Sequence, residues 1–314
     1  MYRYEMHYKH PNVLEKVIES VRYYKYATRI LKKRKYDFVI LWREYAVFLF
    51  SQFVFHHYKG RYSVNIRDLW SKRNIPVTIG VKKAVKGSAF NTVCSDGFIP
   101  HLPPADYLFL QCINHDASKK LRELVTSIPE HNKHEGPINI VYIGTLRFKE
   151  YCCRLTDVFG NDNRFCVKFI GQGSEEIEKY AKKKGYSNVM CKGAFPPEET
   201  AELLIGADII NCAYGTASDA ERTLIPTRFY YAVDMNCLVL TTEGTWVQKK
   251  ANDLKIGISI PSSISGNYQS IANKVYDDYI ALTANRDLKL LQNCRDEIEK
   301  TNAMFEKKFL ECLQ

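Results

Sequence analysis

The second half of the chain contains six short, mostly apolar segments, most of which end at a glycine or another small residue. They are 138-INIVYIG-144, 165-FCVKFIG-171, 188-NVMCKG-193, 208-DIINCA-213, 237-CLVLTT-242 and 256-IGISI-260. Polar stretches with a helical pattern separate most of them. Nearly continuous apolar strands that alternate with helices are typical of a parallel sheet covered on both faces. This half of the chain is therefore predicted to be an α/β domain.

The first half shows the same alternation in a weaker form. A helix is expected over 12–35 and a second helical run to about residue 57. Strands are expected at 37–42, 91–95 and 106–111, and 62–70 is expected to be a strand that leads into a charged turn. The polar stretch 129-PEHNKHEGP-137 is the best linker. A chain of 314 residues has room for about two domains. We predict one domain over 1–132, a second over 138–285, and a C-terminal helix over 286–314 that packs back on the first.

The charge balance points to an anionic partner. The net charge is +10 and the isoelectric point is about 9.0, while 46% hydrophobic and 25% charged residues are ordinary values for a globular protein. A nucleic acid, an acidic membrane surface and a phosphorylated substrate all remain compatible with this charge. No recognisable nucleic-acid-binding module occurs in the sequence, so no nucleic acid is expected as a partner.

The cysteines indicate a reducing compartment. Ten are scattered along the chain without a Cys-x-x-Cys pair or a zinc-like Cys/His spacing, and several lie in apolar runs. The first ten residues are polar and aromatic, unlike a signal peptide. The apolar run 45-YAVFLFSQFVF-55 is too short to cross a bilayer. We therefore expect a cytoplasmic protein.

The residues that follow the strands of the second half suggest a binding edge. Small residues let the backbone approach a ligand closely. Carboxyl ends of parallel strands meet at one edge, where α/β proteins bind ligands. The strand ends concerned are 144-GTLR-147, 171-GQGS-174, 193-GAF-195 and 213-AYGTASD-219.

The stretch 221-ERTLIPTRFYYA-232 adds a charge to this edge. Pro226 suits the first turn of a helix, whose free backbone N–H groups and partial positive charge attract phosphate. Arg228 can form two parallel hydrogen bonds to phosphate oxygens, and Arg147 can close on the same group. The alternative is that Arg228 is an ordinary solvated or ion-paired residue of the helix.

Taken in order, these segments resemble the nucleotide-sugar-binding domain of GT-B glycosyltransferases, in the group of retaining enzymes that build bacterial polysaccharides. The resemblance covers residues 138–260 best. It is carried as a set by INIVYIGTLR, VKFIGQGSEE, VMCKGAFPPEETAELLIGADIINCAYG and IPTRFYYAVDMNCLVLTT. In the first half, 66-IRDLW-70 and 95-SDGFIPHLP-103 are similar to segments of capsule-type members. The resemblance implies two Rossmann-like domains facing a cleft.

The resemblance also implies an activity, the transfer of a hexosyl group from a nucleotide diphosphate donor to an acceptor hydroxyl in capsule or exopolysaccharide synthesis. It places the donor diphosphate and the nucleoside in the second half. The diphosphate residues are Gly144, Thr145, Arg147, Thr227 and Arg228. The nucleoside residues are Gly171, Gly173, Gly193, Ala194, Phe195, Tyr214, Gly215 and Tyr231.

On the acceptor side the resemblance suggests Asp96, Gly97 and His115, with Asp96 and His115 as catalytic candidates. Such folds need no bound metal, and no Asp-x-Asp motif occurs here. We expect no cofactor apart from the donor itself. The acceptor is expected to be a saccharide or a lipid-linked saccharide. A basic, aromatic region over 21–35, together with 45–55, could rest on an anionic membrane at its inner face.

Two features depart from the family pattern. Many members have a Glu–seven residues–Glu motif whose second Glu holds the donor ribose, and Tyr231 takes that place here. A tyrosine hydroxyl bonds a ribose less strongly than a carboxylate does. The chain also opens at a later helix, so its first domain is expected to be short or to lack the first βα units. A catalytically impaired sugar-nucleotide binder and a nucleotide-sugar epimerase therefore remain alternatives.

Overall fold

The computed structural model describes residues 2–8, 12–70, 74–127 and 136–314. These residues form two compact units. Unit 1 comprises Met1–Leu110 and Lys300–Gln314, and unit 2 comprises Gln111–Glu299. The division at Leu110 comes earlier than the boundary expected near residue 132, because helix α4 belongs to unit 2. Most of the expected linker, 129–137, lies outside the described residues.

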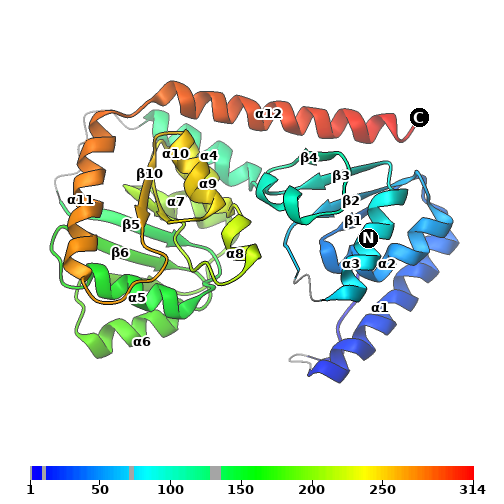
Figure 1. The fold of residues 1–314 in the computed structure, drawn as a ribbon, viewed down its shortest axis with the longest axis horizontal. Coiled ribbons are helices and arrows are strands. Elements are labelled where there is room, and N and C mark those ends of the chain that lie inside the picture. The colour runs from blue at the N-terminus through cyan, green and yellow to red at the C-terminus, as the bar shows by residue number, and fades with distance from the viewer. Residues whose placement is uncertain (1, 9–11, 71–73, 128–135) are drawn as a thin grey trace. The chain divides into compact units, whose positions relative to one another are not determined.

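Unit 1 contains a four-stranded parallel sheet in the order β1-β2-β3-β4. Its strands are β1 (Val39–Trp42), β2 (Tyr62–Ile66), β3 (Phe90–Val93) and β4 (Tyr107–Phe109). Its helices are α1 (Val13–Arg34), α2 (Glu44–His57), α3 (Ile75–Gly87) and the 3₁₀ turn η1 (Asp96–His101). Every strand pairs with the next one in sequence, so α2 and α3 lie side by side on one face (Figure 1). The helices and strands expected in this half are confirmed.

The sequence specifies both ends of α1. The Asn12 side chain accepts a hydrogen bond from the Glu15 amide, and the Glu15 carboxylate accepts one from the Asn12 amide, which is a capping box. The last turn carries Lys32, Lys33 and Arg34, whose positive charges favour a helix C-terminus.

The long C-terminal helix α12 (Leu288–Glu311) contributes to both units. From Lys300 onward it belongs to unit 1. There, the Phe305 ring contacts Phe90 and the Phe309 ring contacts Phe38, with ring centroids 5.9 and 5.6 Å apart. These contacts bury the apolar face of its last turns.

Unit 2 contains a six-stranded parallel sheet with helices on both faces. The strands are β5 (Ile138–Ile143), β6 (Phe165–Ile170), β7 (Val189–Lys192), β8 (Ile209–Asn211), β9 (Leu238–Thr242) and β10 (Gly257–Ile260). The helices are α4 (His115–Ser127), α5 (Lys149–Phe159), α6 (Ser174–Lys184), η2 (Pro197–Glu199), α7 (Thr200–Leu204), α8 (Asp219–Thr223), α9 (Thr227–Met235), α10 (Trp246–Asp253) and α11 (Tyr268–Ala284). All six predicted strands are confirmed.

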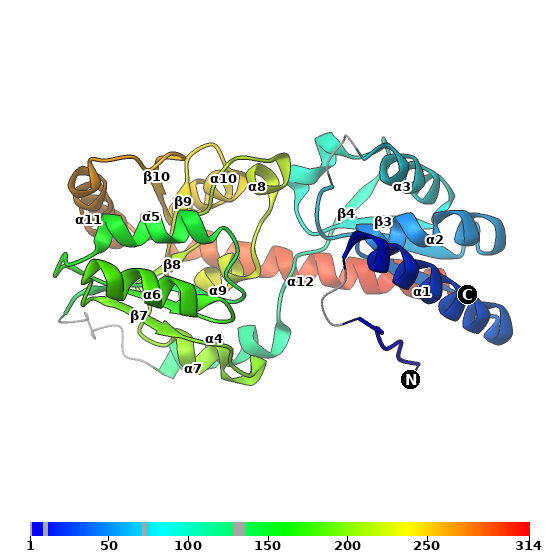
Figure 2. The same cartoon turned by 90° about the horizontal axis from the view of Figure 1, so that it is seen from below.

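The helices of unit 2 form two layers. Helices α5, α6 and α11 pack on one another over one face of the sheet, and α5 and α6 lie side by side in Figure 2. Helices α4, α7 and α9 cover the other face. All six residues of β5 are buried, which explains why its sequence is a continuous apolar run.

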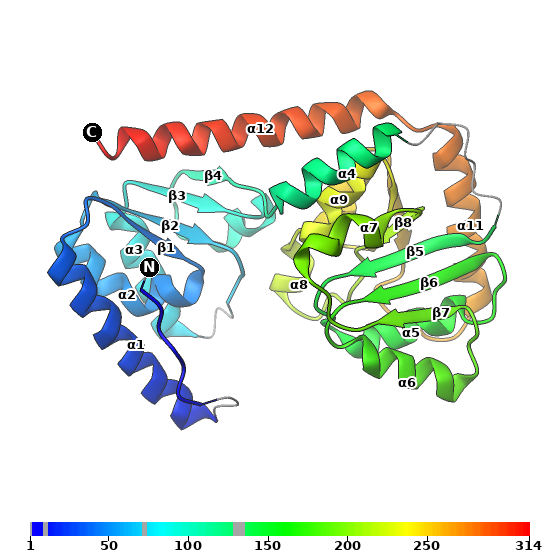
Figure 3. The same cartoon turned by 180° about the vertical axis from the view of Figure 1, so that it is seen from behind.

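The strand order of unit 2 places its ligand-binding position. The order is β10-β9-β8-β5-β6-β7, so the chain proceeds outward from β5 to β7 and then returns to β8 on the other side of β5. Figure 3 shows β5, β6 and β7 as neighbouring arrows that run in one direction. The order therefore reverses between β5 and β8. In open α/β sheets, ligands bind outside the carboxyl ends of the two strands at such a switch point.

Candidate functional site

Arg228 lies at the switch point of unit 2. It is the second residue of α9, and Pro226 is the residue just before that helix rather than within its first turn. Its Nε atom donates a hydrogen bond to the carbonyl oxygen of Asn211, the last residue of β8, at 2.6 Å. Its Cζ atom lies 3.9 Å from the centroid of the Tyr142 ring on β5. Helix α9 thus places a half-buried guanidinium between the two strands where the order reverses.

The geometry leaves part of this guanidinium available to a ligand. Within the described part of the chain, no oxygen accepts a hydrogen bond from either terminal nitrogen of Arg228, and its other side-chain partner is the neutral thiol of Cys212. At the start of α9 the Phe229 amide donates to the Pro226 carbonyl oxygen at 3.0 Å, whereas the Thr227 and Arg228 amides have no intrahelical partner among the described residues. Together they provide donors and positive charge for an anion.

The loop after β5 is held close to the same point. The Tyr142 hydroxyl donates to the carbonyl oxygen of Thr145 at 3.1 Å, which fixes the turn 144–147. Gly144 has φ of 114° and Gly171 has φ of 136°. A Cβ atom on Gly171 would lie 2.1 Å from the Gly144 carbonyl oxygen. The ends of β5 and β6 therefore meet backbone to backbone, which requires glycine at position 171.

A buried chain of hydrogen bonds joins the next strand ends. The Tyr214 amide donates to Thr242 Oγ1 at 3.0 Å, and Thr242 Oγ1 lies 3.0 Å from the Tyr151 hydroxyl. Tyr151 in turn donates to the Pro261 carbonyl oxygen at 3.2 Å. Because Tyr151 donates to Pro261, the Thr242 hydroxyl must donate to Tyr151. The chain connects the end of β9 and the residues that follow β8 and β10 with helix α5.

Two buried thiols border the Arg228 guanidinium. Burial raises the pKa of Cys152 to about 12, and the positive charge of Arg228 opposes that rise without cancelling it. Burial likewise raises the pKa of Cys212 to about 12, again against Arg228. Both thiols are therefore protonated at neutral pH and contribute no negative charge that would compete for the arginine.

Another face of α9 is turned toward the start of α4. Thr227 and Tyr231 are four residues apart, so they share this face. The Thr227 hydroxyl lies 3.2 Å from the Cys112 sulfur. Burial raises the pKa of Tyr231 to about 12, and a hydrogen bond from the Asn114 side chain lowers it by less. Tyr231 therefore already has a polar partner in unit 2, on a different side of α9 from the one that carries Arg228.

His115 was expected among the contacts of the first domain, and the structure corrects this placement. The chain leaves the unit 1 sheet at β4 and enters α4, whose buried residues Ala117 and Leu121 pack it on unit 2. His115 is the exposed first residue of that helix, and Asn114 caps it by accepting a hydrogen bond from the Ala117 amide at 3.2 Å. The apolar run before His115 predicted a strand, but it did not show that the chain passes from unit 1 to unit 2 after Leu110.

The remaining expected residues of unit 2 lie along the carboxyl edge of the same sheet. Thr145 and Arg147 are exposed on the loop after β5. The Gly173 amide donates to the Glu175 carboxylate at 3.0 Å, at the start of α6. Gly193, Ala194 and Phe195 follow the edge strand β7 and are half-buried, exposed and half-buried.

Tyr214 and Gly215 follow β8. The Tyr214 side chain is buried, and burial raises its pKa well above the usual value. Its ring packs on Phe148 with centroids 5.7 Å apart. The Glu221 carboxylate folds back onto this loop and accepts a hydrogen bond from the Ala217 amide at 3.1 Å. The sequence assigned no role to Glu221, and its contact was not predicted.

In unit 1 the carboxyl edge of the sheet carries Asp96 and a charged cluster that the sequence did not single out. Asp96 is half-buried at the start of η1. Arg43 follows β1 with φ of 74° and forms an ion pair with Asp68 at 2.8 Å. Glu44 lies next to it, and one of its carboxylate oxygens is buried without a hydrogen-bond partner among the described residues. Burial is the largest of the effects that raise the pKa of Glu44, and the negative charge of Asp68 adds to it.

The described residues contain no group of three or more His, Cys, Asp or Glu side chains arranged to hold a metal ion. Across residues 2–8, 12–70, 74–127 and 136–314, no helix has both the length and the apolar character required to cross a bilayer.

The two parallel α/β units define the GT-B architecture, in which two Rossmann-like domains are joined in one chain, and the predicted fold class is confirmed. Solved structures of this architecture that resemble the chain include glycosyltransferases and UDP-sugar epimerases. At 10–15% identity, the likeness establishes the fold. No model of a known protein family and no curated protein matches the sequence.

Three of these structures show how far the likeness extends. Sucrose-phosphate synthase from Thermosynechococcus elongatus has a TM-score of 0.70 at 10% identity, over 96% of this chain and 81% of that one. WaaG, a glycosyltransferase involved in lipopolysaccharide biosynthesis, has a TM-score of 0.62 at 15% identity, over 94% and 82%. UDP-GlcNAc 2-epimerase from Neisseria meningitidis, bound to UDP-GlcNAc, has a TM-score of 0.56 at 12% identity, over 93% and 83%.

Proposed function

We propose that unit 2 binds a nucleoside diphosphate sugar at its switch point and that the chain transfers the sugar to an acceptor hydroxyl. The observation that carries this proposal is Arg228, a half-buried cation held by Asn211 and Tyr142 at the point where the strand order reverses. Support comes from HepE of Anabaena, which has a TM-score of 0.56 at 10% identity over 92% of this chain and 84% of that chain, in a structure described as a complex with UDP.

In the proposed reaction, the bond between the sugar's anomeric carbon and the diphosphate oxygen breaks, and its electron pair remains on the diphosphate. Arg228, the N-terminus of α9 and the loop Gly144–Arg147 would stabilise this developing negative charge. The acceptor oxygen forms the new bond to the anomeric carbon and gives up its proton. We propose that no metal ion is required, because the permanent charge of an arginine serves the leaving group.

For the nucleoside we propose the loops after β6, β7 and β8, with Gly171, Gly193 and Tyr214 among the contacts. Tyr231 occupies the place expected of a ribose ligand, but Asn114 already engages its hydroxyl. Asn114 donates to the Tyr231 oxygen, so the Tyr231 O–H remains available to donate to a ribose oxygen. Asp96 and His115 remain proposals for the groups that handle the acceptor's proton.

For the acceptor side we propose a saccharide, or a lipid-linked saccharide, in bacterial polysaccharide synthesis of the capsule or exopolysaccharide type, with a retaining outcome. The basic last turn of α1 and the net charge of +10 favour contact with an anionic membrane surface. Flotation with anionic vesicles tests this. Binding should fall steeply as salt rises, and equal flotation with neutral vesicles would contradict it.

An epimerase is the second candidate because UDP-GlcNAc 2-epimerases are among the structural neighbours, with TM-scores of 0.56 and 0.58 at 12% and 14% identity. Such an enzyme would require paired carboxylates and a histidine deep in the site. The sequence contains no histidine from residue 136 to residue 314. A sugar-nucleotide binder without catalytic activity is the third candidate, because of Tyr231.

Calorimetric titration with UDP and GDP is the primary test. The proposal expects one nucleoside diphosphate to bind with a single site per chain, and the absence of binding to every nucleoside diphosphate would overturn it. Proton NMR of the matching sugar nucleotide then separates the three candidates. Transfer requires an added acceptor, epimerisation changes the sugar without one, and a silent binder leaves the sugar unchanged.

A further inference from the structure

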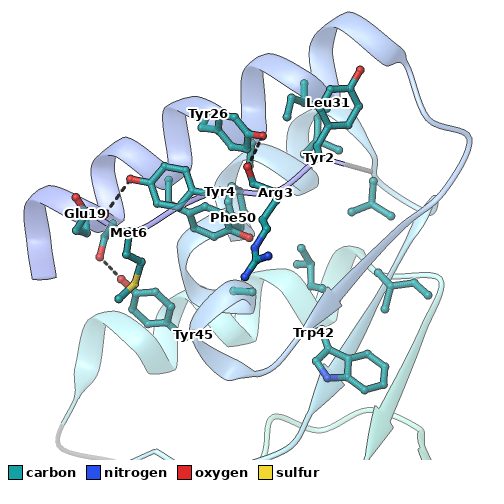
Figure 4. Close-up of a pocket in the computed structure, with 18 of the residues that line it drawn as sticks. Tyr2, Arg3, Tyr4, Met6, Glu19, Tyr26, Leu31, Trp42, Tyr45 and Phe50 are labelled. Carbon is teal, nitrogen blue, oxygen red and sulfur yellow. Dashed lines mark hydrogen bonds between the residues drawn. The ribbon is translucent and has the colours of Figure 1, made fainter. Parts of the chain in front are cut away.

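A large cavity lies within unit 1, distant in sequence from every residue assigned to the donor site. It has a volume of about 1040 Å³ and opens between α1, α2, β1 and the N-terminal segment (Figure 4). The described residues 2–8 of that segment form a strap that runs along α1 (Figure 4). The Tyr26 hydroxyl donates to the Arg3 carbonyl oxygen at 3.0 Å, and the His7 amide donates to Glu19 at 3.2 Å.

The cavity walls present carbon rather than polar atoms. Six tyrosines line it, and other protein groups hold the hydroxyls of four of them, Tyr2, Tyr4, Tyr26 and Tyr45. Tyr4 donates to Glu19 at 3.0 Å, and Tyr45 hydrogen-bonds Ser20. The rings of these tyrosines therefore remain as apolar surfaces, and Phe50 and Leu31 complete the walls. A cavity of this kind binds hydrocarbon rather than a polar sugar.

One side of the cavity is the open edge of the unit 1 sheet. Among the described strands, β1 pairs with β2 alone and forms the edge. Ile40 and Trp42 of this strand are 38% and 49% exposed and line the cavity. A peptide strand could pair with this edge over the four residues of β1. Beyond them the cavity walls are aromatic rings, which provide no backbone hydrogen-bond partners. An added strand would leave its other polar groups unpaired.

Two basic residues line the cavity. The Arg3 side chain points from the strap into the space between Phe50 and Trp42 (Figure 4). No carboxylate forms an ion pair with Arg3 among the residues that the structure describes. Lys16 also lines the cavity. Glu19 is the one acidic residue of the described lining, and Tyr4, His7 and Arg22 already engage it.

We propose that this cavity binds the hydrocarbon chain of an anionic amphiphile, with the chain against the aromatic walls and the head group at Arg3 and Lys16. The positive charges of Arg3 and Lys16 favour an anionic head group, and the apolar walls favour a long hydrocarbon chain. The volume of about 1040 Å³ lies just above the range of about 300–1,000 Å³ that is typical of ligand pockets. The site does not depend on sugar transfer, so it can be tested whether or not unit 2 binds a nucleotide.

Displacement of a fluorescent fatty-acid analogue from the full chain tests the proposal. The competitors are octyl, decyl and dodecyl phosphate, dodecyl maltoside and inorganic phosphate, all below micelle formation. Each methylene should contribute about fourfold in affinity, or about 200-fold from octyl to dodecyl phosphate. Arg3→Gln should weaken dodecyl phosphate about tenfold and leave dodecyl maltoside unchanged. Affinity that does not depend on chain length, or competition by inorganic phosphate alone, would overturn the proposal.

Filling the cavity provides a second test. Ala27 and Ala46 line it, so Ala27→Trp and Ala46→Phe should each reduce binding of dodecyl phosphate at least tenfold by occupying the space. Ala284→Trp, an exposed alanine at the end of α11, is the matched control. Circular dichroism and the nucleotide titration show whether each variant is folded. If both folded cavity variants bind as the original chain does, the proposal fails.

Sedimentation distinguishes the rival occupant, a second copy of the chain pairing along β1. A dimer that Ala27→Trp dissociates would identify that occupant and overturn the amphiphile site. A monomer at all concentrations, with binding that depends on chain length, supports it.

Discussion

The guanidinium of Arg228 stacks on the Tyr142 ring at 3.9 Å, which ties the first turn of α9 to the central strand β5. A cation over an aromatic face is stabilised by roughly 0.5–2 kcal/mol. The Asn211 carbonyl holds the same side chain from β8. The position of the charge is therefore set by both strands of the switch point before any ligand arrives.

Arg228→Met should weaken the binding of a nucleoside diphosphate by about 1.5–3 kcal/mol, the range of a charged hydrogen bond. The aliphatic side chain keeps bulk against Tyr142 but offers no donor. Calorimetric titration measures the change. Arg154→Met, at an exposed arginine of α5, is the matched control. An unchanged affinity in folded Arg228→Met would show that Arg228 supports the structure and does not bind the diphosphate.

Gly171→Ala should destabilise unit 2 by about 3–5 kcal/mol, because left-handed strain adds to a steric clash. The new Cβ atom would lie 2.1 Å from the Gly144 carbonyl oxygen, which is part of the backbone and cannot rotate away. Gly185→Ala provides the comparison, since Gly185 has φ of 72° and open space around it. That change should cost about 1–2 kcal/mol. Urea unfolding measures both, and similar losses would contradict the close approach of the two strand ends.

Thr242→Val should cost about 1–3 kcal/mol, because the Tyr214 amide loses its buried acceptor. Tyr151→Phe removes the next member of the chain. Since Thr242 and Tyr151 act in one hydrogen-bonded chain, the loss in the double variant should be smaller than the sum of the two single losses. A double-mutant cycle by urea unfolding measures this coupling. Strict additivity would show that the two hydroxyls act independently.

Glu44→Gln should stabilise unit 1 at neutral pH. Burial and the charge of Asp68 raise the pKa of Glu44, so folding favours its protonated form. The stability that this group contributes is full below the ordinary Glu pKa and is lost as the pH rises through the raised value. The benefit of the glutamine should therefore fade as the pH is lowered toward 4. Melting temperatures between pH 4 and pH 7.5 measure the difference.

For Glu44 the matched control is Glu306→Gln at an exposed position of α12. If Glu44→Gln raised the melting temperature equally at every pH, the result would contradict a raised pKa of Glu44. It would mean that the charge of the Glu44 carboxylate has no effect on stability.

The sheet of unit 2 could be predicted from the sequence because local patterns determine it. A strand such as β5 is covered on both faces, so burial requires an unbroken apolar run, and the turn after it uses Gly144 at positive φ. The place of Arg228 followed from the same logic. A helix that begins after a proline beside strand ends must present its first residues to that edge.

Other features could not be predicted because they depend on contacts between segments that are distant in sequence. The orientation of Tyr231 depends on Asn114, more than a hundred positions earlier, and no local spacing encodes it. His115 was misplaced because the polar stretch 129–137 was a stronger boundary signal than the crossing at Leu110. Glu44 was missed because a single glutamate in a helical run reveals neither its burial nor the charge of Asp68.

The two buried thiols at the switch point also make it possible to time its motions. Alkylating reagents attack thiolates, and burial keeps Cys152 and Cys212 both protonated and covered. Each can react only during the moments when its surroundings open. Mass spectrometry can follow the rate at which these two side chains are alkylated. That rate measures how often the structure beside Arg228 opens locally. A ligand bound at Arg228 should lower this alkylation rate in proportion to its occupancy.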